Sequence, residues 1–121
     1  MKKIVVFSLV LLLLACSESK TLSPSETAKV VAESFYHGDE ETLKKYTTAS
    51  GFENLSSIQS MFAQDKDSKT DFKIIEEATE GDVVWVKYTT AFDSKASIFK
   101  LVKEDGHWKV THNGPRDKGP F

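Results

Sequence analysis

The three histidines are the first candidates for acid–base chemistry in this chain of 121 residues. His37 lies in the segment YHGD, where a helix is expected to end, and an imidazole there favours the helix dipole and has a structural role. His107 and His112 are five residues apart, so in one continuous strand their side chains face opposite sides and cannot chelate a metal together. His112 shares its strand face with Trp108 and Val110. It is the best candidate for a base in a pocket, although a histidine at such a position more often has a structural role.

Among the acidic residues, Glu76 is the one placed where a carboxylate could act as a base. Aspartates at caps and turns already have a sufficient backbone role, and these are Asp39, Asp82, Asp93 and Asp105. Alternation places Glu76 on the same strand face as Phe72 and Ile74, and a carboxylate desolvated on the concave side of a sheet would have a raised pKa. Ordinary solvation at the end of the strand is the alternative. The candidate pocket residues are Glu76, Tyr88, Trp108 and His112.

Several classes of function lack support in the sequence. No metal-ligand spacing, phosphate-binding loop or nucleophile motif occurs, so we assign no catalytic residue, no metal and no cofactor. Removing residues 1–15 takes away two lysines and no acidic residue, which leaves 14 basic and 18 acidic side chains and a formal net charge of −4. Arg116 is the one arginine, and no lysine stripe with interleaved aromatic residues occurs. These features argue against a nucleic-acid partner.

The N-terminus has the features of an export signal. Lys2 and Lys3 precede an apolar run over residues 4–15 that only Ser8 interrupts. As a helix this run would span about 18 Å, which is short of the roughly 30 Å hydrocarbon core of a bilayer. A basic start, a short apolar run and a small residue at its end predict a cleaved signal peptide over residues 1–15.

The segment LLAC, at residues 13–16, resembles the bacterial lipoprotein box. In that box the cysteine is lipidated and becomes the first residue after cleavage, so the resemblance implies a membrane anchor at Cys16 and a location in the cell envelope. Ser17 stands where an aspartate would resemble the inner-membrane retention signal, which implies the outer membrane in a Gram-negative cell. The alternative is an ordinary secretory signal that leaves a free thiol, which would be prone to oxidation.

Helices are expected in the first half of the folded part. Ser23 and Glu26 form a capping box around Pro24, and Gly38 suits the turn after the helix. Its buried stripe is expected to contain Ala28, Val31, Ala32 and Phe35. A short second helix follows Asp39. A second capping-box pattern, Ser50 with Glu53, predicts the start of a third helix.

From Asp71 onward the hydrophobic period changes from about four residues to two. We expect strands over residues 71–78, 83–92, 96–104 and 107–112. Asp105 and Gly106 suit the positive φ angles of a tight hairpin turn. Helices followed by an antiparallel meander predict an α+β fold.

The segments SPSETAKVVAESFYHGD and FKLVKEDGHWKV together resemble the small bacterial lipoproteins with domain of unknown function 4878, in the nuclear transport factor 2-like superfamily. The resemblance implies N-terminal helices packed on a curved, cone-like, four-stranded antiparallel sheet over residues 23–112. Residues 16–22 would be the lipidated cysteine and a short tether, and 113–121 an irregular tail. The family brings no established activity, but enzymes of the wider superfamily place a carboxylate or histidine base in the cone.

The second face of the predicted sheet is more apolar than a solvated face should be. If Ile75, Trp85, Ile98 and Val102 share it, they form an apolar patch flanked by lysines, which is typical of a contact surface. A homodimer or another envelope protein would be the partner. The alternative is that the helices or the C-terminal tail cover part of this face.

These observations predict a lipid-anchored envelope protein with a non-catalytic domain that binds a small apolar ligand or a protein. One alternative is an isomerase- or dehydratase-like enzyme that uses Glu76 or His112 as a base in the cone. Another is an immunity or inhibitor protein.

Overall fold

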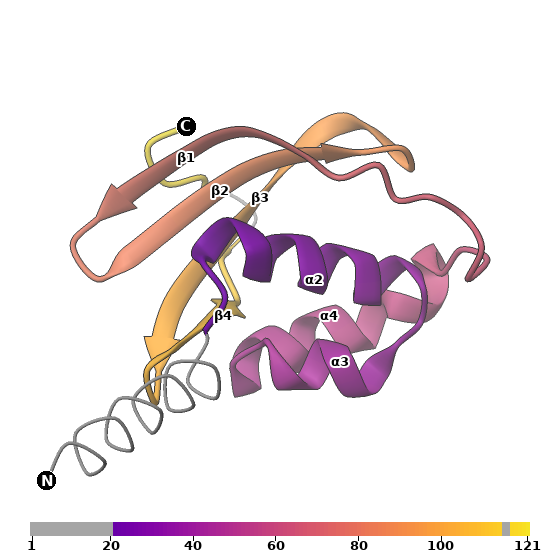
Figure 1. The fold of residues 1–121 in the computed structure, drawn as a ribbon, viewed down its shortest axis with the longest axis horizontal. Coiled ribbons are helices and arrows are strands. Elements are labelled where there is room, and N and C mark those ends of the chain that lie inside the picture. Colours follow the sequence, from indigo (N-terminus) through magenta and orange to yellow (C-terminus); the bar gives the residue numbers. More distant parts are fainter. Residues whose placement is uncertain (1–20, 115–116) are drawn as a thin grey trace, which may run out of the picture.

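The structure, a computed structural model, describes residues 21–114 and 117–121 as helices followed by a sheet (Figure 1). The elements are α2 (Pro24–Tyr36), α3 (Glu40–Lys45), α4 (Ala49–Phe62), β1 (Lys73–Glu80), β2 (Val83–Thr90), β3 (Asp93–Glu104) and β4 (His107–Thr111). The sheet has the order β1-β2-β3-β4, and all neighbouring strands are antiparallel. The expected α+β fold is confirmed. The predicted signal peptide and Cys16 lie outside the described residues.

The start and end of α2 follow from its own sequence. Ser23 Oγ accepts a hydrogen bond from the Glu26 amide at 3.2 Å, and Glu26 Oε1 accepts one from the Ser23 amide at 2.9 Å. His37 ends the helix, and Gly38 follows it with a φ of +70°, which favours glycine. The predicted capping box and the glycine turn are confirmed.

The start of α4 differs from the prediction. Thr48, not Ser50, caps this helix, and its Oγ1 accepts a hydrogen bond from the Gly51 amide at 3.1 Å. The cause is a tertiary contact, because the Thr48 amide donates to the Val110 carbonyl at 2.9 Å and so holds Thr48 in an extended conformation. The sequence around Ser50 is typical of a helix cap, but the contact of Thr48 with β4 makes the helix begin earlier.

The strands begin and end within three residues of the predicted limits. Asp105 and Gly106 have φ angles of +53° and +80°, which confirms the predicted hairpin turn. An irregularity in β1 was not expected: Ile74 pairs with Tyr88, but Glu76 pairs with Lys87. A β-bulge at this point reverses the faces of all following residues of β1.

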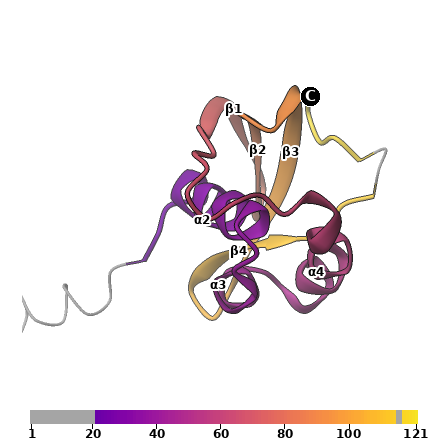
Figure 2. The same cartoon turned by 90° about the vertical axis from the view of Figure 1, so that its right-hand side faces the viewer.

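The core lies between α2 and the inner face of the sheet. The expected stripe of α2 is buried, and it packs with Leu43 and with inward-facing residues of β2, β3 and β4. These strand residues are Val84, Val86, Tyr88, Phe99, Leu101 and Val110. Figure 2 shows β4 turned strongly relative to the other strands, so that the curved sheet wraps around the helices.

The backbone of α4 approaches β4 closely at Gly51. A Cβ added to Gly51 would lie 3.1 Å from Thr111 Cα and still closer to the Val110 carbonyl oxygen. The Val110 amide also donates to the Tyr46 carbonyl at 2.9 Å, so the segment before α4 covers the free edge of β4. These contacts fix the start of α4 against the end of β4, which is where the candidate site forms.

Candidate functional site

Two adjoining cavities open between α4 and the ends of β3 and β4. The outer chamber has a volume of about 360 Å³ and is lined by Ser50, Glu53, Asn54, Ser57 and His112. The inner chamber has a volume of about 220 Å³, and its walls include Leu55, Tyr88, Ser97, Ile98 and Phe99. Asn54 and His112 line both chambers. We call the two chambers together the mouth.

One face of α4 supplies most of the outer chamber. Ser50, Glu53, Asn54 and Ser57 follow one another at intervals of three, one and three residues, which places them on the same side of a helix. Ser57 Oγ donates to the Asn54 carbonyl at 2.7 Å, within the helix itself. The side chains of Glu53 and Asn54 are exposed and form no hydrogen bond or ion pair with any described residue.

His112 stands opposite this helix face. It is exposed and has no hydrogen-bond or ion-pair partner among residues 21–114 and 117–121. An imidazole without an orienting partner is poorly arranged for base catalysis, but both its nitrogens are available to a ligand. Three planar polar side chains, those of Glu53, Asn54 and His112, therefore converge on the outer chamber without partners among the described residues.

Tyr88 forms the floor of the inner chamber. It is 5% exposed, and its ring centre lies 5.0 Å from that of Phe72 and 4.7 Å from that of Phe99. Burial, and to a smaller extent the neighbouring Tyr36, raises the pKa of Tyr88 well above its ordinary value, and a hydrogen bond with Ser97 opposes this only in part. The phenol therefore stays protonated and acts as a hydrogen-bonding group rather than as a base.

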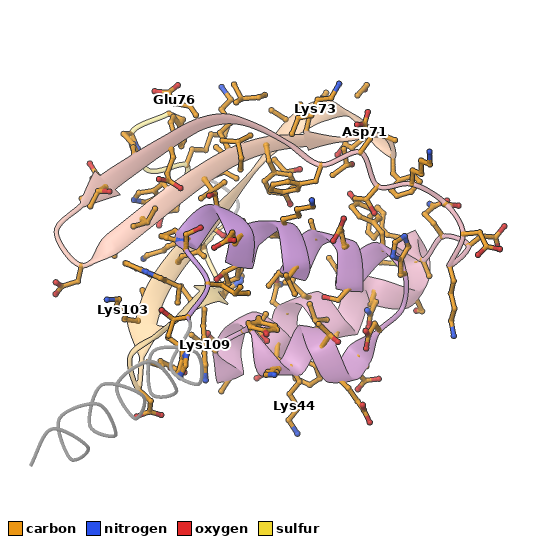
Figure 3. All side chains as sticks on the ribbon, viewed as in Figure 1. Lys44, Asp71, Lys73, Glu76, Lys103 and Lys109 are labelled. Carbon is orange, nitrogen blue, oxygen red and sulfur yellow. The ribbon has the colours of Figure 1, made fainter. Side chains whose placement is uncertain are left out.

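Two of the four predicted pocket residues lie elsewhere. Glu76 is exposed and pairs with Lys87, on the face opposite to Tyr88, and Figure 3 shows it projecting away from the helices. The expectation that it faces the cone is wrong, because the bulge in β1 breaks the alternation with Ile74. Trp108 packs half-buried against the core, with Lys103 Nζ 5.3 Å from its ring centre, and does not line the mouth.

Tyr88 and His112, in contrast, both line the inner chamber. The polar face of α4 was missed. Its signal is the spacing of Ser50, Glu53, Asn54 and Ser57, but a solvated helix face has the same spacing. The interpretation of Ser50 and Glu53 as a cap also hid it.

His37 has the structural role that its position indicates. Its Nε2 lies 2.8 Å from the Ser68 carbonyl oxygen, which ties the end of α2 to the segment before β1. Within the two described ranges, His, Asp and Glu side chains nowhere gather as a group of three or more that could hold a metal ion. No helix in those ranges combines the length and the apolar character needed to cross a bilayer.

The outer face of the sheet is covered at its centre by the C-terminal tail. Trp85 is only 4% exposed, because Gly119 lies against its indole ring; a Cβ on that glycine would be 2.8 Å from Trp85 Cε3. Lys100 Nζ lies 5.5 Å from the Trp85 ring centre, and Lys87 Nζ lies 5.7 Å from that of Phe121. Figure 2 shows the tail returning to the sheet on the side away from α2.

The four residues predicted as an interface therefore do not form one open patch. Ile75 is 52% exposed, whereas Trp85 is buried under the tail. Val102 is half-buried, and Ile98 is half-buried and lines the inner chamber. The alternative weighed from the sequence, that the tail covers part of this face, agrees with the structure.

Comparison with known proteins identifies the fold. No family model matches the chain, and no curated protein matches it. A crystal structure of a candidate NTF2-like transpeptidase from Campylobacter jejuni, where NTF2 is nuclear transport factor 2, is similar in structure. The TM-score is 0.62 and the sequence identity 18%, over 76% of this chain and 100% of that chain. Together with the helices-first order and the curved antiparallel sheet, this similarity shows that the chain has the nuclear transport factor 2-like fold.

Proposed function

We propose that this chain is a lipid-anchored envelope protein whose nuclear transport factor 2-like domain binds a small ligand at the mouth. One observation carries the binding function: Glu53, Asn54 and His112 converge on one opening and have no partners among the described residues. Polar groups that are held together without internal partners are available to a ligand. The anchor rests on the LLAC segment at residues 13–16, and the location in the outer membrane of a Gram-negative cell rests on Ser17, which stands where an aspartate would resemble a retention signal.

Binding fits the site better than catalysis. Tyr88 is held as a neutral phenol, and Glu76 lies on the other face of the sheet. Among the described residues, none gives His112 an acidic or carbonyl partner that would orient it. An isomerase- or dehydratase-like reaction would therefore depend on His112 alone.

The residues of this site give little support to the transpeptidase activity in the name of the Campylobacter jejuni protein. Transpeptidation needs a nucleophile that a base activates. Ser57 donates its proton to a backbone carbonyl, and Ser50 contacts the hydroxyls of Thr48 and Thr111 rather than a base. A role as an inhibitor, an immunity protein or a homodimer has less support, because the tail covers Trp85 on the face that such a partner would use.

Exchange of Cys16 tests the anchor. Cys16→Ser should abolish incorporation of labelled palmitate in growing cells, because no other cysteine is present to form the thioether. Ser17→Ala is the control and should keep the label. Undiminished label in the Cys16→Ser protein would disprove the anchor, and with it the predicted kinship with the lipoproteins of domain of unknown function 4878.

A panel of small molecules tests the mouth. The full chain in a detergent without a sugar head group is titrated with glucose, benzoate, putrescine and the dipeptide alanylalanine, while amide chemical shifts are followed. We expect at least one probe to shift residues 50–57 and 111–113, and His112→Ala to weaken that response. His107→Ala, an exposed histidine at the other end of β4, is the matched control. Shifts that gather elsewhere would contradict ligand binding at the mouth, and so would the absence of any shift with these probes and with the ring sugars described below.

A further inference from the structure

We propose that the ligand of the mouth is a saccharide, whose adjacent hydroxyl groups bind the polar face of α4 and whose apolar C–H face packs in the inner chamber. This inference rests on the proposed function, since it names the chemical class that the same site takes.

The charges around the mouth favour a neutral ligand. Among the described lining residues Glu53 is the one acid, and no lysine or arginine lines either chamber. Phosphates and carboxylates are normally held by arginine, lysine or a helix N-terminus, and divalent cations by several carboxylates. These residues include no lysine or arginine and no second carboxylate. The first turn of α4 does line the mouth at Ser50 and Gly51, but the Gly51 amide already donates to Thr48 Oγ1, and the carboxylate of Glu53 opposes an anion there. The mouth therefore offers directional hydrogen bonds rather than a strong charge.

The unpartnered side chains match adjacent hydroxyl groups. The carboxylate of Glu53 offers two acceptors, the amide of Asn54 an acceptor and donors, and the imidazole of His112 either role. Neighbouring hydroxyls on a sugar ring each donate and accept, so a planar side chain can engage two of them at once. Three such side chains at one opening can hold several hydroxyls of one ring.

The hydroxyl groups of Thr48, Ser50 and Thr111 lie together beside the outer chamber, and that of Ser50 is a further hydrogen-bond donor for a ligand. Thr48 Oγ1 donates to Thr111 Oγ1 at 2.8 Å. Ser50 Oγ lies 3.3 Å from both of these oxygens, at the long end of the hydrogen-bond range. The Ser50 hydroxyl is thus held in place at the rim by weak contacts, and its proton can turn toward a ligand.

The inner chamber supplies the apolar surface that a sugar also needs. Leu55 lines it together with Tyr88 and Phe99, while Ser97 and Asn113 keep it partly polar. The C–H face of a sugar ring can pack against such a wall while its hydroxyls point to α4. A purely apolar ligand would leave the polar groups desolvated and unpaired. The outer chamber, at about 360 Å³, is in the range of roughly 300 to 1,000 Å³ that is common for small-molecule sites.

Saturation-transfer NMR on the full chain, again in a detergent without a sugar head group, tests the inference. The probes are glucose, galactose, mannose, N-acetylglucosamine and its linear tetramer, with open-chain sorbitol as the control polyol. We expect at least one ring sugar to receive saturation, strongest at its C–H protons, and to shift residues 50–57 and 111–113. Stronger binding of the tetramer than of its monomer would identify a glycan chain as the source of the sugar, and equal binding a free saccharide; both results support the inference.

Variants of α4 locate the contact. Asn54→Ala should weaken binding of the responding sugar by about fivefold or more, because it removes paired hydrogen bonds. Ser60→Ala, an exposed residue of the same helix that does not line the mouth, is the matched control. Glu53→Gln keeps a planar hydrogen-bonding group and should weaken binding less than Glu53→Ala does, which separates a contact from loss of folding.

The outcomes of the two experiments remain distinguishable. Benzoate, putrescine or alanylalanine could shift the amide signals of residues 50–57 and 111–113 while no ring sugar binds. In that case the saccharide proposal is wrong, and the proposal of ligand binding at the mouth stands. If no probe of either panel shifts the mouth, both proposals fail. Equal binding of sorbitol and the ring sugars would also overturn the saccharide, since an open chain has no apolar ring face.

Discussion

On the inner face of the sheet the helices cover the strands but leave the mouth open beside β4, whereas on the outer face the end of the chain lies over Trp85. The open region is lined by polar groups such as Asn54 and His112, and the covered one is centred on an indole. An apolar strand face can thus be covered by a segment without regular structure. A polar helix face can be part of a cavity.

The two covers are attached in different ways. Inside, hydrogen bonds join the elements: Gln59 Nε2 donates to the carbonyls of Ser34 and Phe35 at 3.1 and 3.2 Å, and Thr48 bonds to β4. Outside, the hydrogen bonds of the described tail residues remain within residues 113–121. Contacts with the sheet there involve rings and lysine side chains. We therefore expect the helices on the inner face to be essential for folding. The tail on the outer face should be removable without loss of the fold.

The two faces of the sheet should differ most in the stability cost of substituting two adjacent residues of β3. Leu101 faces the core and is fully buried, whereas Val102 faces outward and is half-buried. Leu101→Ala should lower the free energy of unfolding by about 2 to 5 kcal/mol, because it leaves a cavity. Val102→Ala should cost less than half as much. Urea unfolding of both variants measures the difference, and equal costs would break the comparison.

The contact between α4 and β4 should be the next most sensitive feature. Gly51→Ala should cost about 1 to 3 kcal/mol of stability, because the new methyl group meets the backbone of Val110 and Thr111 and forces a shift. It should also change the response of the mouth to its ligand. Gly114→Ala is the matched control, since a Cβ there meets no heavy atom of the described residues within 4 Å, its chain neighbours aside. A Gly51→Ala melting temperature at or above that of the parent would show that the close approach is not required.

Removal of the tail tests the outer cover. Deletion of residues 114–121 in a Trp108→Phe background, which leaves Trp85 as the one tryptophan, should shift its fluorescence to longer wavelength and increase quenching by acrylamide. The cost in stability should be about 2 kcal/mol, the order of burying one large apolar side chain. Trp108→Phe with the tail intact is the control. Unchanged emission after deletion would mean that the sheet buries Trp85 without the tail.

The smallest expected effect is a loss of stability at high pH that the buried phenol of Tyr88 causes. Burial raises the pKa of Tyr88, so above the ordinary tyrosine value of about 10 the unfolded chain loses this proton while the folded chain keeps it. Stability should therefore fall as pH rises above 10, by up to about 1.4 kcal/mol per unit from this group. The decline should be smaller in Tyr88→Phe, and Tyr46→Phe should retain it. Urea midpoints between pH 8 and 11 would measure this, and parallel curves for Tyr88→Phe and the parent would contradict it.

The sequence predicts those parts of the fold that depend on neighbouring residues. The capping box at Ser23 and the hairpin turn at Asp105 and Gly106 are local, and both are confirmed. The bulge after Ile74 could not be predicted, because strict alternation explains the sequence of β1 equally well. The cap of α4 depends on Val110, more than sixty residues away in the chain.

The candidate site was predicted only in part, for a similar reason. Tyr88 and His112 were found because strand alternation points them inward. Asn54 and its helix neighbours were missed, because whether a polar helix face is solvated or lines a cavity depends on what lies opposite. The lipid anchor at Cys16 stays a prediction, since that residue lies outside the described ranges.

The bulge in β1 has a second consequence, for the behaviour of many copies together. β1 is an edge of the sheet, and an unpaired edge can template the addition of a strand from another molecule. Here the edge is irregular and carries exposed charges at Lys73, Glu76, Glu77 and Glu80. Both features oppose edge-to-edge aggregation. If the proposed anchor crowds these domains on a membrane surface, the irregularity that turns Glu76 to the outer face also helps to keep neighbouring copies apart.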